Sequence, residues 1–148
     1  MTPLFAQGLN RTRLLLLCVL LFCPALARSA ELMLAVHPPP QIAELSLNEA
    51  RAIFSMRLKT WPDGTPITVY VLSRENPEHH RFVRTQLKLL PHQLQRNWDR
   101  MVYTGIGQAP IEVNNFQEML HSLLSKPGSI GYLPAGMQNE ELLNVTVH

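Results

Sequence analysis

The residues with the clearest chemical potential lie in one short stretch, where hydrogen-bond donors gather around the start of a predicted helix. Guanidinium, imidazole, hydroxyl and amide groups are the donors that proteins offer to phosphate and other oxyanions. The candidate ligands in this stretch are Ser73, Arg74, Asn76, His79 and Arg81, with His80 beside them. One interpretation is an anion site in which Arg74 is the principal donor. The other is a solvated helix start whose charges serve solubility.

The same stretch also carries features that oppose anion binding. Pro77 has no backbone N–H to donate, and Glu75 and Glu78 place negative charge beside the donors. A carboxylate that faces a phosphate opposes its binding, because like charges close together are unfavourable. The residues of this stretch therefore leave both interpretations open.

Neither metal binding nor catalysis is indicated. His79 and His80 are adjacent in the sequence, so on a helix their side chains point about 100° apart and do not readily share one ion. The sequence has no Gly-x-Ser-x-Gly elbow, no phosphate-binding P-loop and no carboxylate pair spaced for acid–base work. We therefore expect no catalytic residue, no metal and no cofactor, and we do not expect an enzyme.

The first thirty residues have the pattern of a cleavable secretory signal. Arg11 and Arg13 precede an unbroken apolar run over residues 14–23, and small residues follow at the positions that a signal peptidase reads. A membrane-spanning helix needs roughly 20 apolar residues, and this run ends sooner, at Pro24. We predict a signal peptide over residues 1–30, cleaved after Ala27 or Ala30, and export to the periplasm of a Gram-negative bacterium.

Removing this segment changes the composition of the chain. Both cysteines, Cys18 and Cys23, lie within it, so we expect no disulfide and no thiol ligand in the mature protein. Three of the thirteen Lys and Arg residues also lie within it, which leaves ten against eleven acidic residues and gives no sign of a nucleic-acid partner. The remaining residues 31–148 have the size of a single domain.

Helical and strand patterns alternate along these residues. Ser46 and Glu49 form a capping box, and Asn76 followed by Pro77 gives an N-cap and a first-turn proline. Strands are expected over residues 32–36, 67–72, 111–113, 130–133 and 142–147, and helices over 47–56 and from about 77, 91 and 116. This order predicts an α/β fold in which helices cover a mixed sheet.

The apolar residues of the helix from Pro91 are expected on one face. We interpret the aromatic residues of the C-terminal half as core and loop-packing residues rather than as a surface on which a ligand stacks. The apolar face of the helix consists of Leu94, Trp98, Met101 and Val102. The aromatic residues interpreted as packing residues are Trp98, Tyr103 and Tyr132.

Four motifs in this order resemble the solute-binding proteins of phosphate ABC transporters and their shorter relatives. A helix of the form Leu-Ser/Asn-x-x-Glu/Ala-x-x-x-Ile-Phe is followed by Trp-x-Asp/Asn-Gly, then by Trp-x-x-x-Val-Phe/Tyr-Thr/Ser-Gly and Pro-Gly-x-Ile-Gly-Tyr. In this chain they are similar to residues 47–54, 61–64, 98–105 and 127–132. The resemblance spans residues 32–147.

The resemblance implies a type II periplasmic-binding-protein architecture, in which two α/β lobes normally close around the ligand. This chain has roughly half the length that two domain-sized lobes need, so we expect a single lobe or a reduced pair. In the resembled family the turn after the strand reads Arg-x-x-x-Ser-Gly-Thr, whereas Asn76, Pro77 and Glu78 stand where Ser-Gly-Thr is expected. The resemblance therefore implies the fold more directly than the ligand.

Two functions follow as hypotheses. In the first, the chain is a periplasmic binding module that captures phosphate or a related anion for an ABC transporter permease or a sensor. In the second, it is a lobe without a ligand that contacts the membrane or a periplasmic partner such as a sensor or a porin.

Overall fold

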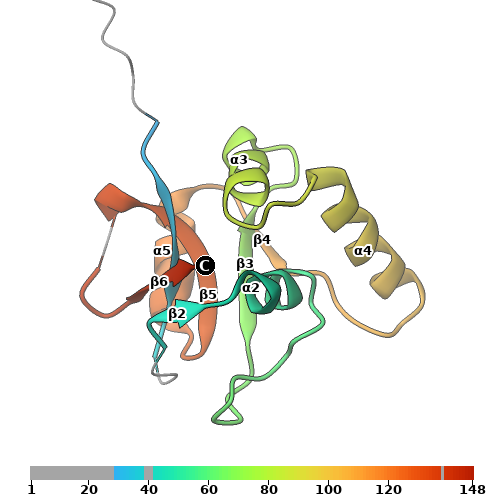
Figure 1. Ribbon diagram of the computed structural model, residues 1–148, viewed down its shortest axis with the longest axis horizontal. Helices are drawn as coiled ribbons and strands as arrows, with labels where there is room; N and C mark the ends of the chain where they lie inside the picture. Colours follow the sequence, from blue (N-terminus) through green and yellow to red (C-terminus); the bar gives the residue numbers. More distant parts are fainter. Residues whose placement is uncertain (1–28, 39–41, 138) are drawn as a thin grey trace, which may run out of the picture.

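The computed structural model describes residues 29–38, 42–137 and 139–148 of the 148-residue chain (Figure 1). The signal peptide predicted for residues 1–30 lies, apart from its last two residues, outside the described part, and so do both cysteines. Among the described residues, no helix has the length and apolar character needed to cross a bilayer.

The described elements follow one another as short strands and helices of two to thirteen residues. The strands are β1 (Leu32–Val36), β2 (Glu44–Leu45), β3 (Thr68–Leu72), β4 (Ile111–Val113), β5 (Ser129–Pro134) and β6 (Leu143–Val147). The helices are α2 (Leu47–Phe54), α3 (Pro77–Thr85), α4 (Pro91–Tyr103) and α5 (Phe116–Ser125), with a 3₁₀ turn, η1, over Ala135–Met137.

The strands form one mixed sheet in the order β2-β6-β1-β5-β3-β4. β3 pairs in parallel with both β4 and β5, and β2 pairs in parallel with β6. β1 pairs antiparallel with β5 and with β6, so it runs against the rest of the sheet. The α/β fold with a mixed sheet, predicted from the element order, is confirmed.

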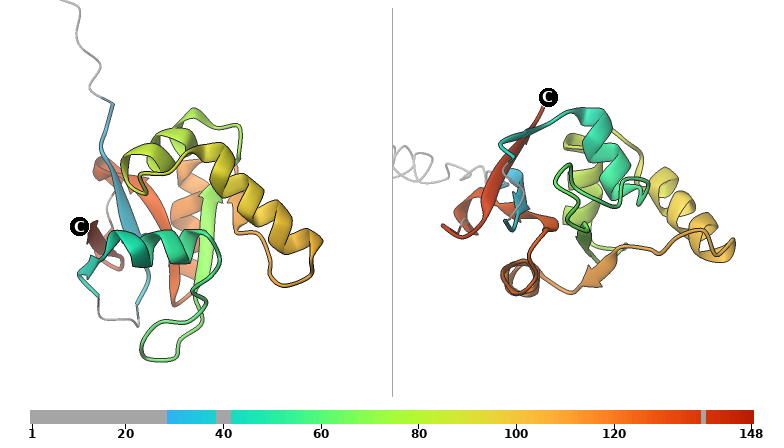
Figure 2. Two further views of the ribbon diagram at one scale, coloured as in Figure 1. Left: turned by 45° about the vertical axis from the view of Figure 1, so that its right-hand side comes forward. Right: turned by 90° about the horizontal axis from the view of Figure 1, so that it is seen from below.

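Helices cover both faces of this sheet (Figure 2). α5 lies on one face, where Gly131 of β5 is packed so closely that a Cβ would come within 2.7 Å of Met119 Sδ. α2, α3 and α4 lie on the other face, where Phe54 and Phe82 pack in the core at a centroid distance of 4.9 Å. The buried core therefore extends through both layers.

Local sequence signals set the starts of three helices. The Ser46 hydroxyl accepts a hydrogen bond from the Glu49 N–H, and Glu49 accepts one from the Ser46 N–H, as in a capping box. Asn76 accepts from the Glu78 N–H at the start of α3, and Asn115 accepts from the Glu118 N–H at the start of α5. These side chains bind helix N–H groups that have no partner within the helix.

Most predicted elements are confirmed, and the exceptions have physical reasons. β2 has only two residues, which is too short to give a periodic pattern. The helix predicted over residues 47–56 ends at Phe54, and Met56 has a φ of 62°, which does not continue a right-handed helix. Tyr103, interpreted as a core or loop-packing residue, has an exposed fraction of 92%, and Val102, expected on the apolar face of its helix, one of 52%, because the described part of the last turn of α4 faces outward.

Gly128 shows how tightly one turn is constrained. Its φ is +78°, and a Cβ there would come within 2.8 Å of Pro66 O and 2.7 Å of Thr65 Cγ2. Gly64 also has a positive φ, +86°, but a Cβ there meets nothing within 4 Å. Comparing an alanine substitution at the two positions therefore distinguishes the free-energy cost of the left-handed backbone from the cost of the close contact.

We predict that Gly128→Ala lowers the free energy of unfolding by about 1–3 kcal/mol more than Gly64→Ala does, because only the first combines a left-handed backbone with a clash. Urea denaturation monitored by circular dichroism measures both values. Equal losses in the two variants would show that the backbone around Gly128 relaxes to accept a side chain.

Candidate functional site

β3 and β4 are neighbouring parallel strands, so their carboxyl ends lie side by side. Residues 73–76 then lead to α3 on one face, and residues 114–115 lead to α5 on the other (Figure 2). In open α/β sheets, ligands bind in the crevice outside the carboxyl ends of strands at such a point. The Ser73 N–H donates to Val113 O at 3.2 Å, which holds the ends of the two strands together.

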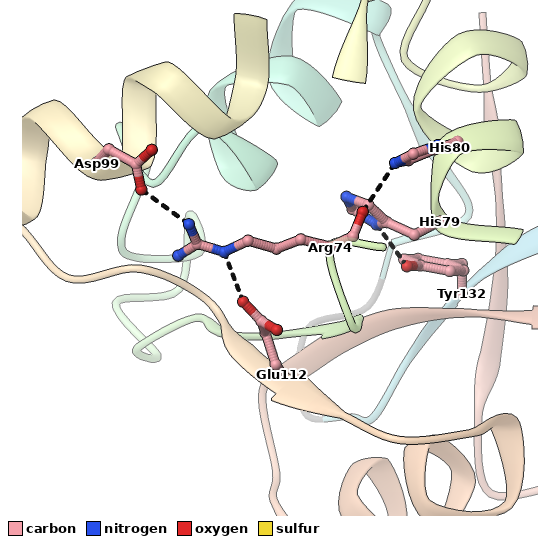
Figure 3. Close-up of polar contacts among 6 residues, drawn as sticks. All are labelled: Arg74, His79, His80, Asp99, Glu112 and Tyr132. Carbon is pink, nitrogen blue, oxygen red and sulfur yellow. Dashed lines mark hydrogen bonds and ion pairs between the residues drawn. The ribbon is translucent and has the colours of Figure 1, made fainter. Parts of the chain in front are cut away.

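Arg74 lies in the turn after β3, and its guanidinium connects two other elements (Figure 3). Nε donates to Glu112 Oε1 of β4 at 2.7 Å, and Nη1 donates to Asp99 Oδ1 of α4 at 2.8 Å. Its Cζ also lies 6.0 Å from the centroid of the Trp98 ring. The hydrogen bonds to Glu112 and Asp99 raise the pKa of Arg74 above its ordinary value.

This arrangement neutralises the cation that the sequence offers most directly to an anion. Two carboxylates surround one guanidinium, so the three groups together carry a net negative charge. An oxyanion that approaches the guanidinium must either displace Glu112 or Asp99 or bind close to both. The carboxyl ends of β3 and β4 therefore do not present Arg74 as a free positive charge.

At each of the two nearby helix starts, one backbone N–H is also already bound by a side chain. Helix N-termini bind anions through free backbone N–H groups and the helix dipole. At α3, Asn76 Oδ1 takes the Glu78 N–H at 2.9 Å, and at α5, Asn115 Oδ1 takes the Glu118 N–H at 2.9 Å. The Glu118 carboxylate then accepts from the Asn114 N–H and side-chain amide, which lower its pKa.

His79 lies in the core rather than in the crevice. It is only 3% exposed, and its Nδ1 lies 2.8 Å from the Tyr132 hydroxyl. That hydroxyl also accepts a bond from the Leu72 N–H at 2.9 Å, and its own proton can be donated to Nδ1 in the tautomer that carries its proton on Nε2. Burial, with a smaller contribution from the neighbouring His80, lowers the pKa of His79 to about 4. Burial also raises the pKa of Tyr132.

The structure separates the five predicted ligands. Ser73 and Arg74 lie in the turn, and Asn76 is engaged as the cap of α3. His79 is buried, whereas Arg81 is paired with Glu78 and lines a different concavity, beside Gln86 and His148. In Figure 3 the Arg74 side chain extends away from His79 and His80 toward Asp99 and Glu112.

A second group of donors surrounds a concavity between α3 and α4, beside the turn after β3. The concavity has a volume of about 270 Å³. His80 is oriented there by a 2.8 Å contact between its Nε2 and Arg74 O. The residues that line it are Arg74, Glu75, His80, Arg84, Pro91, His92 and Gln95.

Sequence reasoning missed most of this concavity. His80 and Arg84 are four residues apart on α3, and His92 and Gln95 are three apart on α4, so each pair shares a helix face. Helical spacing therefore gave a signal within each helix. No sequence signal showed that α3 and α4 approach each other, because their approach depends on tertiary packing.

Metal ligation finds no support in the described part of the chain. No group of three or more His, Cys, Asp or Glu side chains is arranged there to hold an ion.

Fold and site together define a single α/β lobe with polar residues at the carboxyl ends of its parallel strands. Similar folds occur in an ABC-type phosphate transport receptor from Vibrio cholerae (TM-score 0.61, 10% identity) and in PstS from Borrelia burgdorferi (TM-score 0.61, 15% identity). A third is a putative phosphate ABC transporter substrate-binding protein with bound phosphate from Clostridium perfringens (TM-score 0.63, 14% identity).

These likenesses confirm the predicted fold. Each match covers 80% of this chain but only 45–47% of the solved chain, so this chain spans less than half the length of those proteins. The partial coverage agrees with the single lobe expected from the sequence. No protein-family model matches the chain, and no curated protein shows a significant match.

We predict that stability falls as the pH is lowered from about 6.5 to 4, because of His79. Its pKa in the folded state, about 4, lies below the ordinary value of 6.5, so over this interval the unfolded chain binds a proton that the folded chain does not. The stabilisation that neutral His79 contributes is complete above pH 6.5. The difference between its unfolded and folded pKa corresponds to about 3 kcal/mol of unfolding free energy lost by pH 4.

Urea denaturation at several pH values measures this dependence. The control is His79→Phe, in which the carboxylates that titrate below pH 5 are unchanged, so the slope between pH 6.5 and 5 should flatten. If wild type and variant show the same slope, the His79 environment is not as described.

Proposed function

We propose that this chain is an exported, periplasmic binding protein, and not an enzyme, which takes phosphate or another small oxyanion in the concavity between α3 and α4. The observation that carries the proposal is the set of donors around that concavity, where His80, Arg84, His92 and Gln95 come from two helices. Its volume of about 270 Å³ is suited to a small anion rather than to a large organic ligand.

Arg84 is the most suitable principal donor in this site. In the described ranges it makes no ion pair, whereas Arg74 is held by two carboxylates and Arg81 by Glu78. A guanidinium binds tetrahedral oxyanions through two parallel N–H bonds. Arg74 lines the edge of the concavity, where its backbone O orients His80, and Ser73 and Asn76 hold the turn that carries it.

Two further observations support a role in binding. The solved proteins with this fold include a transport receptor and a substrate-binding protein, which have phosphate transport in common. The basic and apolar start of the sequence, with small residues after the apolar run, supports export. A permease of an ABC transporter is the partner that this function implies.

We predict that calorimetric titration of the purified chain with inorganic phosphate gives saturable heat, and that Arg84→Ala weakens binding roughly tenfold or more. A hydrogen bond to a charged group contributes about 1.5–3 kcal/mol, which corresponds to at least this factor. Arg81→Ala is the matched control, since it removes a guanidinium from the same helix outside the concavity, and it should bind phosphate as the wild type does.

The same titrations test where the anion binds. Loss of binding in Arg74→Ala with normal binding in Arg84→Ala would place the anion in the crevice at the end of β3 instead. Flat titrations with phosphate, sulfate and molybdate would end the oxyanion proposal altogether.

The second candidate function is a ligand-free lobe that contacts another periplasmic protein, such as a sensor or a porin. The observation that favours it is the occupied polar groups at the end of β3 and β4, where Glu112 and Asp99 neutralise Arg74 and asparagines cap the starts of α3 and α5. Crosslinking in producing cells should then recover one defined protein. Recovery of the free chain alone would count against this function.

A further inference from the structure

The C-terminal end of α4 carries an unusual exposed surface. Three apolar side chains lie within five residues of one another, with exposed fractions of 52% for Val102, 92% for Tyr103 and 74% for Ile106. Three exposed cations lie on the same helix end or on the segment after α2. We call these six residues the α4 tip: Arg57, Lys59, Arg100, Val102, Tyr103 and Ile106.

A groove of about 440 Å³ is lined by two of the cations, Arg57 and Arg100, and by one of the apolar residues, Ile106. It lies between the end of α2 and the last turns of α4, and Arg57 and Arg100 line it together with Asn97, Met101, Thr104 and Ile106. Lys59 Nζ lies 3.5 Å from Ile106 O, which places the third cation beside the same loop. Guanidinium and amide donors therefore share one groove with apolar side chains.

The positive charge of the tip is not neutralised within the protein. In the described part of the chain, none of the three cations makes an ion pair with a carboxylate. Asp99, one turn before Tyr103 on α4, is engaged by Arg74. A partner that complements this surface must therefore carry negative charge next to apolar groups.

Size and charge decide between possible partners. A specific protein–protein interface uses roughly 20–30 residues on each side, far more than the six of the tip. A second copy docking symmetrically through the tip would bring Arg57, Lys59 and Arg100 close to their own counterparts, which is unfavourable. The end of α4 and the loop after it also project from the body of the molecule (Figures 1 and 2), as a segment that meets a flat surface would.

We propose that the α4 tip docks on a membrane surface that contains anionic phospholipids. Arg57 and Arg100 bind a lipid phosphate in the groove, while Tyr103 and Ile106 enter the boundary between headgroups and acyl chains. Aromatic and aliphatic side chains favour that boundary, and nearby Lys and Arg residues are attracted to anionic lipids. The tip shares no residue with the concavity between α3 and α4, so this proposal does not depend on oxyanion binding there.

The test is vesicle flotation with the chain as the producing cell processes it, its first residue identified by mass spectrometry. Vesicles with 30% phosphatidylglycerol in phosphatidylcholine should carry the protein, and pure phosphatidylcholine should carry much less. Arg100→Glu should weaken binding roughly tenfold or more, since each basic side chain near an anionic surface contributes about fivefold. Tyr103→Ser with Ile106→Ser should also weaken it, and 0.5 M salt should reduce binding.

Two matched controls make the result specific. Lys126→Glu changes the net charge as Arg100→Glu does, but at the end of α5, and Leu90→Ser removes an exposed apolar side chain from the other end of α4. Both should bind vesicles within about twofold of wild type. The proposal is overturned if phosphatidylglycerol vesicles carry no protein, if Lys126→Glu weakens binding as much as Arg100→Glu, or if soluble glycerophosphoglycerol binds as tightly as the vesicles.

Discussion

The geometry of the candidate site depends on one buried hydroxyl, that of Tyr132. It accepts a hydrogen bond from the Leu72 N–H at the end of β3 and bonds to His79 Nδ1 of α3. The Tyr132 ring stacks on Phe82 with centroids 3.8 Å apart, so apolar packing keeps water away from both bonds. An unpaired polar group in such a position costs about 1–3 kcal/mol. Since residues 73–76 connect Leu72 to α3, this contact fixes both ends of the turn that carries Arg74.

The fold places Arg74 at the carboxyl ends of the parallel strands, where α/β proteins bind ligands. Two neighbouring carboxylates then pair with this cation. Arg74 is paired with Glu112 of β4 and Asp99 of α4, and these contacts fix the edge strand and the projecting helix relative to the turn. Such partly exposed pairs contribute at most about 1 kcal/mol each. Their larger effect is electrostatic, because they neutralise Arg74, whereas Arg84 and the cations of the α4 tip make no ion pair among the described residues.

α4 is the element through which these features meet. Its first turns supply His92 and Gln95 to the concavity, its middle supplies Trp98 to the core and Asp99 to Arg74, and its last turn is uncovered. The Trp98 indole N–H donates to Phe54 O at 2.8 Å, which anchors the helix to the end of α2. One helix therefore carries buried, paired and exposed residues in succession along its length.

The sequence by itself determined the elements and much of their order. The capping box at Ser46, the Asn76-Pro77 start of α3 and the β-branched run of β3 are local signals, and local hydrogen bonding and backbone preference suffice to decide them. The motifs near residues 98–105 and 127–132 also pointed to the fold. The types of hydrogen-bond donor around residue 74 could also be read from the sequence, since the identity of a residue does not depend on tertiary contacts.

Only the tertiary structure decided which of those donors meet. Glu112 and Asp99 lie 38 and 25 residues from Arg74, and Tyr132 lies 53 from His79, so no local pattern links them. The burial of His79 and the exposure of Tyr103 likewise depend on which helix face the sheet covers, because the same residue types occur in both environments. Long-range packing, which no short sequence window contains, thus converted a row of apparent anion ligands into a core histidine, two paired arginines and a helix cap.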